Sequence, residues 1–463
     1  MKARLALVFA VGILIWLIPS PEGVDPKAWH LFAIFVATLA GIVAKPLPMG
    51  AMALTGIAAA LLTRTLTLAE ALSGFSNITV WLVVSAFFIA AGFIKTGLGT
   101  RLAYLLVSLF GKSSLGVGYS LVATDLVLAP AIPSNTARAG GVVFPILQSI
   151  AKTVFGDDPV KGPQTSAFLT LVTYQGTVIT SGMFVTSMVA NPLIVQLAAT
   201  QGIVITWTGW TVAALVPGLL SLIVIPLVIY AAYRPGFVKT PEAPAFARAA
   251  LKEMGPMKRG ERLMGGISIV MIVMWIFGTV LSLDPTATAI MAIAALLLTG
   301  VLTWDDLCTQ REAWDTYVWF ATVVMMATFL AQFGLIKWFS EQVGPMFQGM
   351  GWITGLLGLS LTYFYTHYFF ASITAHVTAM YLPFLVLAIG LGAPPQLAAL
   401  LLAFFSSLFA SLTHYGTPPG AILFGGGHVS LGAWWRVGLI VSFVNIAIWL
   451  GAGALWWKAL GLW

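Results

Sequence analysis

The chain has 463 residues, of which 59% are hydrophobic and 8% are charged, and its formal net charge is +7. Soluble globular proteins contain about 25% charged residues, so this composition excludes a soluble globule and leaves no stretch for a soluble catalytic domain. The basic residues lie mostly in short loops between apolar runs, a pattern of membrane topology rather than of nucleic-acid binding. Cys308 is the only cysteine, which excludes an intrachain disulfide.

The first half of the chain predicts six membrane spans. A run of roughly 20 apolar residues is long enough to cross a hydrocarbon core of about 30 Å. The run behind Lys2 and Arg4 lacks a small-x-small cleavage site, so we expect a first span there rather than a signal peptide. The predicted spans lie at about 4–19, 28–44, 47–63, 78–97, 164–200 and 208–233, with an amphipathic segment at about 99–111.

Residues 130–145 interrupt this apolar pattern with hydroxyl, amide and guanidinium groups between prolines and glycines. The flanking apolar pieces, 114–131 and 137–155, are joined too closely to reach opposite membrane faces, so they predict a re-entrant hairpin. Lipid cannot satisfy free backbone groups, and such a break must therefore be packed in protein or line a watery cavity. Thr180-Ser181-Gly182 and residues 186–192 break the span at 164–200, which predicts a discontinuous helix.

The second half of the chain repeats this plan after a polar stretch at 234–262, whose seven basic and three acidic residues favour the cytoplasm. We predict spans at about 263–281, 286–303, 315–332, 396–424 and 433–456, of which 396–424 is discontinuous, with an amphipathic segment at about 334–347 and a second hairpin at about 351–390. Matching residues lie 237 positions apart (Thr79 and Thr316, Gly97 and Gly334) or 238 apart (Thr136 and Thr374, Arg138 and His376, Pro145 and Pro383). This regularity indicates an internal duplication.

The predicted fold is an all-α polytopic membrane protein of about 11 transmembrane helices, with two inverted repeats that each hold a re-entrant helical hairpin and a discontinuous helix. With the first span counted as extra, each repeat contains five crossings and one hairpin, and this odd number of crossings inverts the second copy. With a cytoplasmic N-terminus, 17 of the 22 Lys and Arg residues fall inside and four fall outside (Lys27, Arg64, Lys337 and Lys458), while Arg138 lies in the hairpin. This construction is typical of secondary transporters.

We divide the chain into six segments. They are the first span and scaffold helices of repeat 1 (1–112), its transport-domain hairpin and broken helix (113–200), its last helix and the basic linker (201–262), the scaffold helices of repeat 2 (263–350), its hairpin and broken helix (351–427) and the last span (428–463).

The two hairpins turn at Ser134-Asn135-Thr136 and Ser372-Ile373-Thr374. Each tip begins a helix, whose free N–H groups and positive dipole end attract an anion. Two tips that face each other would hold an anion with a carboxylate at each end. The alternative is that these polar residues only cap their helices.

A basic residue follows each tip, Arg138 in the first and His376 in the second. Arginine can form a forked contact with a carboxylate, and histidine can be neutral or charged. The alternative for Arg138 is a local ion pair with Asp125, the only acidic residue in a predicted hydrophobic segment. This scarcity of acids favours an anionic substrate and predicts neither a metal site nor a cofactor.

The broken spans should supply the rest of the binding site. We expect it to include Thr186, Ser187, His414, Gly416, Thr417 and Pro418. Pro418-Pro419 has the alternative role of a packing kink. We interpret His30, His367 and His428 as interfacial or structural.

These motifs resemble the divalent anion/sodium symporter (DASS) family, whose signature is a pair of Ser-Asn-Thr tips. Residues 130–145, 365–376 and 411–416 are similar to its exchanger branch, the 2-oxoglutarate/malate, citrate/succinate and tartrate/succinate antiporters. Ser372-Ile373-Thr374 departs at its middle residue. The resemblance implies a homodimer with an elevator mechanism, and it puts Arg138 and His376 where built-in cations could replace the Na⁺ ions of coupled members.

The predicted function is Na⁺-independent exchange of dicarboxylates (2-oxoglutarate, malate, succinate or related di- and tricarboxylates) across the inner membrane. A fixed charge without a counter-ion would slow the empty carrier. The expected partners are small dicarboxylate anions and membrane lipid, not nucleic acid. The alternatives are a Na⁺-coupled symporter of the same fold and an anion channel. An enzyme is least supported, since no Ser/His/Asp grouping or metal-ligand spacing stands out.

Overall fold

The computed structural model describes residues 2–156, 158–343 and 351–463, and no β-strand occurs within these ranges. By length and composition, seven of the described helices can cross a membrane. The helices agree with the predicted spans to within a few residues at most of their ends. The predicted amphipathic segment at 334–347 is helical up to Val343, and its last four residues lie outside the described ranges.

The first half contains α1 (Lys2–Leu17), α2 (Pro26–Ala44), α3 (Met49–Leu62), α4 (Leu68–Leu72), η1 (Ser73–Ser76), α5 (Ile78–Thr96), α6 (Leu98–Phe110), α7 (Ser114–Leu128), η2 (Ala137–Val143), α8 (Phe144–Val154), α9 (Lys161–Met183), η3 (Val185–Ser187), α10 (Ala190–Ala199), α11 (Trp207–Ala232) and α12 (Glu242–Met254). The helix α12 lies within the polar linker, where the sequence predicted no helix. The second half contains α13 (Arg259–Ile276), α14 (Gly278–Leu281), α15 (Pro285–Leu298), α16 (Trp304–Cys308), α17 (Arg311–Gln332), α18 (Leu335–Val343), α19 (Trp352–Tyr365), η5 (Thr366–Phe369), α20 (Ile373–His376), η6 (Val377–Tyr381), α21 (Leu382–Gly390), α22 (Pro395–Leu408), η7 (Phe409–Leu412), α23 (Pro418–Gly425), α24 (Leu431–Ile448), η8 (Trp449–Gly453) and α25 (Ala454–Ala459).

The residues that repeat in the sequence have the same structural roles in both halves. Gly97 is the C-cap residue of α5, and Gly334 directly follows the C-cap residue of α17. Their φ angles are 75° and 82°, a backbone conformation that glycine adopts without strain. Pro145 and Pro383 each lie two residues after a π-helical stretch, η2 or η6, inside a continuous helix, where proline removes one backbone hydrogen bond. The duplication read from the sequence is therefore a structural repeat.

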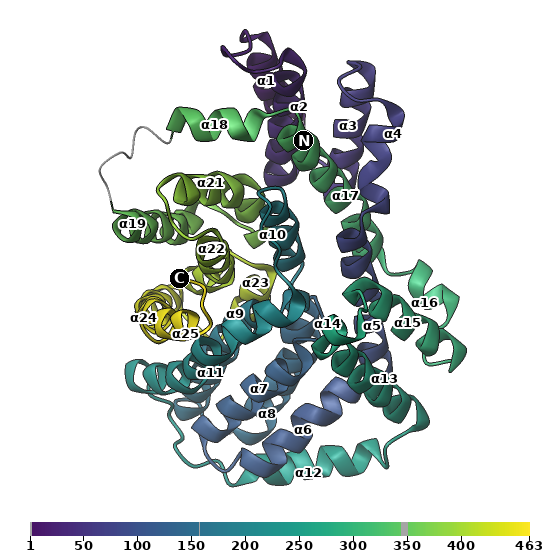
Figure 1. Ribbon diagram of the computed structural model, residues 1–463. Coiled ribbons are helices and arrows are strands. Elements are labelled where there is room, and N and C mark those ends of the chain that lie inside the picture. The colour runs from purple at the N-terminus through teal and green to yellow at the C-terminus, as the bar shows by residue number, and fades with distance from the viewer. Residues whose placement is uncertain (1, 157, 344–350) are drawn as a thin grey trace.

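The helices form two groups. In Figure 1 the scaffold group (α1–α5 and α13–α17) lies along the top and right of the view and the hairpin group (α7–α11 and α19–α25) at its left and centre, with α6 and α12 across the lower end. Within the scaffold group α17 packs on α3 and α5, and within the hairpin group α9 packs on α7, α11 and α22. The last helices of both repeats, α11 and α24, contact each other and belong to the hairpin group by packing.

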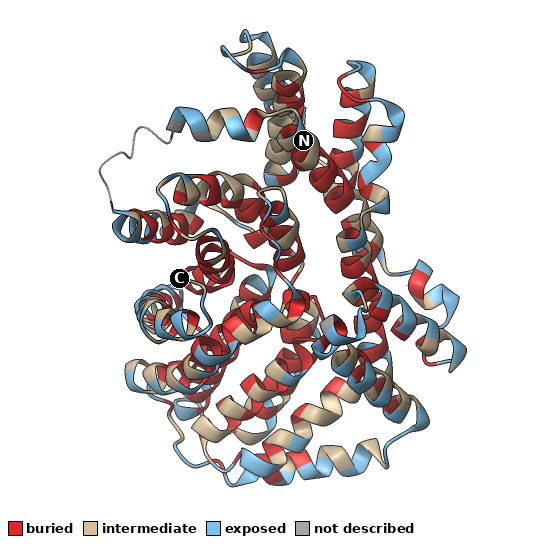
Figure 2. Cartoon of the chain, in the orientation of Figure 1, coloured by how far each residue is buried: buried red, intermediate tan, exposed pale blue. Residues whose placement is uncertain are grey.

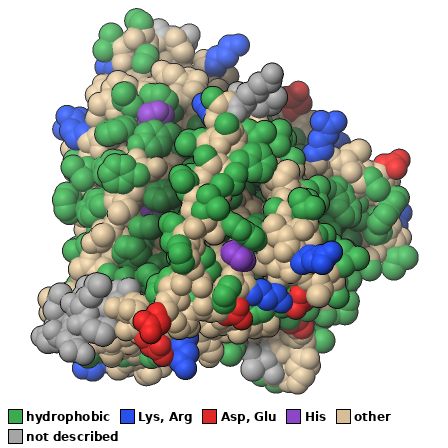
Figure 3. Space-filling view, turned by 90° about the horizontal axis from the view of Figure 1, so that it is seen from above, with side chains coloured by type: hydrophobic (Ala, Val, Ile, Leu, Met, Phe, Trp, Pro, Cys, Tyr) green, Lys and Arg blue, Asp and Glu red, His purple; other side chains and the backbone are tan. Residues whose placement is uncertain are grey.

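The deepest element is α9, whose residues from Thr165 to Met183 are all buried. Figure 2 shows that buried positions gather along the helices inside the bundle, while exposed positions lie on the perimeter. Large apolar side chains are exposed there, among them Leu62 (86%) and Leu298 (88%). In the face seen in Figure 3 hydrophobic side chains are spread over the whole surface, among backbone and other side chains. An apolar perimeter of this kind suits contact with the lipid of a membrane.

Polar contacts join residues that the predicted topology places on the same side of the membrane. Arg101 of α6 donates from Nε and Nη2 to the two oxygens of Glu261, at 2.6 and 3.1 Å, and from Nη1 to the Gly255 carbonyl at 2.9 Å. Lys95 and Asp306 form an ion pair at 2.5 Å. All of these residues belong to the predicted cytoplasmic side, so the contacts agree with the predicted order of crossings.

The Lys95–Asp306 pair should make a pH-dependent contribution to stability. The hydrogen bond from Lys95, together with that from the Thr303 N–H, lowers the pKa of Asp306 from 3.8 to about 2. Because the folded-state pKa is depressed, the stabilisation is present above pH 3.8 and is lost as the pH falls toward 2. Both side chains are partly exposed, so the effect should be only about 0–1 kcal/mol.

The measurement is the melting temperature of wild type and Asp306→Asn in detergent from pH 7 down to pH 3. We expect a small deficit in the variant at pH 7 that shrinks at the acid end. Asp305→Asn, on the same short helix and exposed, is the matched control and should show no deficit. A deficit of equal size at every pH would contradict the assignment to this carboxylate.

Candidate functional site

The two hairpin tips have the same hydrogen-bond pattern. Ser134 Oγ accepts from the Ala137 N–H at 3.1 Å, and Ser372 Oγ accepts from the Ala375 N–H at 3.4 Å. Both serines thus cap their helices, which is the alternative role that the sequence left open for them. A π-helical stretch follows each cap, η2 in the first repeat and η6 in the second. π-helical turns are rare and are frequent at functional sites.

The other polar residues of the tips remain available. The side chains of Asn135, Thr136 and Thr374 are partly exposed, and among the described residues none of them has a hydrogen-bond partner. The first intrahelical bonds are made by the N–H groups of Arg138 and His376, at 3.0 and 3.1 Å. The N–H groups of Ala137 and Ala375 are bonded to the capping serines, and the two N–H groups before each of these are free, as at any helix start. Each tip therefore presents unpaired donors at a positive helix end.

Ile373 replaces the amide residue of the first tip. Its side chain is 5% exposed, whereas Asn135 is partly exposed. The second tip therefore offers fewer side-chain donors than the first.

Arg138 lies behind the first tip and is fully buried. Its Nε donates to Asp125 Oδ1 at 3.1 Å, and Asp125 also accepts from the Thr180 hydroxyl. Its Nη1 donates to the carbonyls of Ile132 and Ser187, each at 2.5 Å. The ion pair with Asp125, the alternative considered from the sequence, is present, so the structure corrects the argument that rested on a fixed charge without a counter-ion.

Arg138 also connects the tip to the break of the first discontinuous helix. Its partners there are the carbonyl of Ser187 and, at 3.1 Å, the hydroxyl of Ser181. Thr186 donates to the Pro130 carbonyl at 2.7 Å, and Ser187 donates to the Ser181 carbonyl at 2.5 Å. Both hydroxyl groups are buried and bonded within the protein, so they hold the break against the hairpin instead of pointing into open space.

His376 lies behind the second tip and is fully buried as well. Its Nδ1 is 3.1 Å from Nδ1 of His367, whose Nε2 is 3.1 Å from the Gly416 carbonyl. His376 thus connects the second tip to the second break through His367, as Arg138 does directly in the first repeat. From the sequence His367 was expected to be interfacial or structural, because nothing in a spacing of nine residues predicts that two rings will meet across a turn.

The second break brings unpaired polar atoms together. Gln175 of α9 donates to the Ser411 carbonyl at 3.1 Å, but its Oε1 and the hydroxyls of Ser411 and Thr413 are buried without partners in the described residues. Gly416 approaches so closely that a Cβ atom there would lie 2.6 Å from His367 Nε2 and 2.9 Å from Thr413 Oγ1. Buried polar atoms without partners are costly and mark a place where water or a ligand can bind.

The remaining predicted site residues lie around this break. His414 is partly exposed and packs against Tyr415 and Phe424. Thr417 is the N-cap residue of α23, and Pro418 is the first residue of that helix and is exposed. A proline at this position starts a helix without loss of a hydrogen bond.

The two repeats interlock around the tips. The π segment of the first hairpin contacts α23, which follows the second break, and the π segment of the second hairpin contacts α10, which follows the first break. In the first of these contacts, a Cβ atom on Gly140 would lie 2.9 Å from Ile422. Each hairpin is thus packed against the broken helix of the other repeat, as a site shared by both repeats requires.

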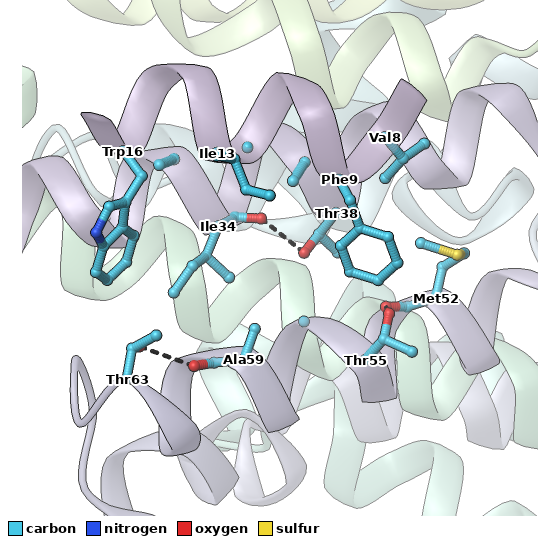
Figure 4. A pocket seen from close by; sticks show the side chains of 14 residues that line it. Val8, Phe9, Ile13, Trp16, Ile34, Thr38, Met52, Thr55, Ala59 and Thr63 are labelled. Carbon is cyan, nitrogen blue, oxygen red and sulfur yellow. Dashed lines mark hydrogen bonds between the residues drawn. The ribbon is translucent and has the colours of Figure 1, made fainter. Parts of the chain in front are cut away.

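Two cavities elsewhere are unsuited to an anion. One of about 300 Å³ lies between α1, α2 and α3 and is lined by apolar side chains such as Phe9 and Ile13, as Figure 4 shows. Two of the hydroxyls in its lining, those of Thr38 and Thr63, each donate to a carbonyl of their own helix at 2.8 Å. A second cavity, of about 630 Å³, between the scaffold group and η6–α21 is also apolar. The hairpin tips are the better candidate.

Residues with metal-binding chemistry do not cluster in the part of the chain that the structure describes, where no group of three or more His, Cys, Asp and Glu side chains occurs.

Comparisons with known proteins give a consistent result. A family model described as "Sodium:sulfate symporter transmembrane region" matches residues 1–463. The chain is 52% identical over 462 residues to the Bacillus subtilis (strain 168) protein named "Putative malate transporter YflS", covering 99% of this chain and 96% of the relative. It is 48% identical over 457 residues to dicarboxylate transporter 1, chloroplastic, of Spinacia oleracea, covering 98% and 80% of the two chains.

A more distant relative and a solved structure extend this comparison. Inner membrane protein YbhI of Escherichia coli (strain K12) is 37% identical over 470 residues, covering 99% of this chain and 98% of the relative. The crystal structure of the YdaH transporter of Alcanivorax borkumensis aligns with a TM-score of 0.54 over 99% of this chain and 97% of that chain. Its sequence identity of 13% supports a likeness of fold alone.

Proposed function

The chain belongs to the sodium:sulfate symporter family, a family of membrane transporters, and from this premise we propose that it exchanges dicarboxylates across the membrane without Na⁺. It is a transporter and not an enzyme. The printed names of its relatives, a malate transporter and chloroplastic dicarboxylate transporters, support a dicarboxylate as the substrate. We take 2-oxoglutarate, malate and succinate as the first candidates.

The arrangement of Arg138 carries the proposal of Na⁺ independence. Sodium ions in proteins bind to oxygen atoms, and backbone carbonyls at a helix break are typical partners in transporters. Here the Nη1 group of Arg138 already donates to the carbonyls of Ile132 in the hairpin and Ser187 in the break. The guanidinium thus occupies the carbonyl oxygens that a bound cation would otherwise use between these two elements.

The free donors of the two tips support recognition of a dianion. One carboxylate would accept from Asn135, Thr136 and the N–H groups of the first tip, and the other from Thr374 and the N–H groups of the second. A dicarboxylate that bridges the tips satisfies both sets of donors at once, whereas a monocarboxylate leaves one set unpaired.

Exchange follows from these same donors rather than from a net charge. Arg138 and Asp125 neutralise each other, so the empty carrier does not carry an uncompensated arginine charge. An empty tip, however, must lose the water on its free N–H and hydroxyl groups when it crosses the barrier, which is costly for groups without partners. A bound dicarboxylate removes this cost, and the loaded carrier therefore crosses faster.

The moving body in this proposal is the hairpin group, which slides as an elevator against the scaffold group. We further propose a homodimer in the inner membrane with a cytoplasmic N-terminus, as the resemblance and the distribution of basic residues imply.

The proposal is tested by uptake of radiolabelled 2-oxoglutarate into proteoliposomes, with or without internal dicarboxylate and with Na⁺ replaced by choline. We expect uptake that requires internal substrate and is unchanged in choline. Uptake into empty vesicles driven by a Na⁺ gradient would instead establish a symporter, and ohmic current without saturation would establish a channel. Internal monocarboxylate is the control and should support little exchange.

A further inference from the structure

Behind the second tip, four polar contacts form a chain between two carbonyl oxygens. The Gly416 carbonyl is 3.1 Å from His367 Nε2, and the two Nδ1 atoms of His367 and His376 are 3.1 Å apart. His376 Nε2 is 3.4 Å from Thr366 Oγ1, which is 2.9 Å from the Tyr363 carbonyl. Carbonyl oxygens only accept hydrogen bonds, so both ends of this chain require a donor.

When both histidines are neutral, this chain of four hydrogen bonds lacks one hydrogen atom. Four contacts need four hydrogen atoms, but two neutral imidazoles and one hydroxyl supply three. If His367 donates to Gly416, His376 donates to His367 and Thr366 donates to Tyr363, then His376 Nε2 faces the Thr366 oxygen with no hydrogen between them. That contact is the longest of the four, at 3.4 Å. One added proton on His376 Nε2 completes the chain.

The surroundings of the pair suit a cation but contain no permanent counter-ion. His376 is stacked between Phe370 and Phe409, with ring centroids 4.5 and 4.4 Å away, and aromatic faces attract cations. The described elements packed against the pair are α2, α19, α22, η6 and η7, and none of them carries an Asp or Glu. A buried cation without an anion is costly, so an anion has to arrive for the proton to stay.

The titratable groups on these elements and on the adjoining break already have other contacts. Tyr363, Tyr365, Tyr381 and Tyr415 are hydrogen-bonded to Ser406, Ser442, Ala399 and Tyr368, Lys27 lies over Phe333, His30 is stacked on Trp16, and His414 accepts from Trp435. Among these groups, the imidazole rings of His367 and His376 therefore remain to take up the proton. The nearest place for a negative charge is the second hairpin tip.

We propose that His367 and His376 form a binding site for one proton, which is taken up from the surrounding water when a dicarboxylate binds between the tips. This inference rests on the proposed function. His376 lies in the first turn of the helix Ile373–Gly390, where the helix dipole opposes a cation unless an anion sits at its N-terminus. The proton and the dicarboxylate bind together, travel together and are released together, so the loaded carrier has one negative charge fewer.

The test is isothermal titration calorimetry of the whole protein with succinate at a pH where both succinate carboxylates are ionised. Titrations in buffers of different ionisation enthalpy report the number of protons taken up on binding. We expect about one proton per bound succinate in the wild type, in the range where an unbound histidine is mostly neutral. We also expect an affinity that falls about tenfold per pH unit toward alkaline pH, as for any ligand whose binding requires one proton.

His376→Gln is the informative variant, because the added proton sits on His376 Nε2, and a glutamine amide there can still donate to His367 Nδ1 but does not titrate. We expect it to bind succinate more weakly with no proton uptake. His30→Gln removes a histidine of the scaffold group and should keep the wild-type uptake. If the heat of wild-type binding does not depend on the buffer, or if His376→Gln takes up the same proton as the wild type, the inference is wrong. Absence of any binding heat in any buffer would instead contradict the proposed function itself.

Discussion

Replacing Arg138 with alanine should abolish dicarboxylate exchange and also destabilise the protein by about 3–5 kcal/mol, the range for removal of one partner of a buried ion pair. Arg138 is fully buried, and its loss leaves Asp125, 1% exposed, as an unpaired buried carboxylate. The carbonyls of Ile132 and Ser187 would lose their donor in the same variant. From the sequence alone we would expect this variant to fold normally, and the burial of the pair revises that expectation.

A double variant separates the two effects. Arg138→Met with Asp125→Asn removes both charges and keeps similar volumes, and replacement of a whole buried pair is often neutral for stability. We expect it to recover most of the melting temperature and none of the exchange, since the hairpin and the break no longer share a cation. Arg436→Ala, an exposed arginine on α24, is the matched control and should behave as wild type.

The measurements are thermal unfolding in detergent and counterflow of 2-oxoglutarate in proteoliposomes. Normal exchange in a well-folded Arg138→Ala protein would remove Arg138 from the transport mechanism. Exchange in the double variant that becomes Na⁺-dependent would show that a sodium ion can take the place of the guanidinium.

The helices were predictable from the sequence because length and polarity decide them in a membrane. An apolar run of sufficient length must be helical there, and a Pro- and Gly-rich polar interruption must be a break. The helix α12 was missed for the complementary reason. It lies in a polar linker, where helix formation depends on packing against α6 and α8 and not on hydropathy.

Within the candidate site, the tips were predictable and their partners only in part. A polar motif that recurs at a constant offset marks both tips without any structure. An ion pair between Asp125 and Arg138 could be considered from composition alone, because Asp125 is the only acidic residue in a predicted apolar segment. The contact of His376 with His367 depends on how α19 and α20 meet around the turn. The unpaired oxygen atoms Gln175 Oε1 and Thr413 Oγ1 depend on how α9 crosses η7. No local sequence pattern encodes either arrangement.

The region where α9 crosses η7 is also where we expect the second large effect of a substitution on exchange. Gly438 of α24 faces the second break so closely that an added Cβ atom would lie 2.4 Å from the Ser411 carbonyl and 3.0 Å from that of Leu412. Real Cβ atoms do not come this near to backbone oxygen, so Gly438→Ala must push α24 away from η7. Overpacking of this kind typically costs about 1–3 kcal/mol.

The same displacement should reach the histidine pair. η7 carries Phe409, whose ring is stacked on both His367 and His376 at 3.9 and 4.4 Å. A shift of η7 therefore disturbs the proposed proton site as well as the break. We expect Gly438→Ala to lower exchange at least about tenfold, a loss that corresponds to about 1.4 kcal/mol, and to weaken proton uptake with it.

Gly432→Ala is the matched control, because Gly432 lies on the same helix and an added Cβ atom there would meet nothing within 4 Å. Alanine is the better helix former by about 0.5–1 kcal/mol, so this variant should be as stable as wild type or slightly more stable, with normal exchange. Comparison of the two variants by melting temperature and by counterflow isolates the close approach of α24 to η7 from the general effect of glycine. Equal behaviour of Gly438→Ala and Gly432→Ala would mean that α24 does not restrain the second break, and the route by which α24 acts on the histidine pair would then be wrong.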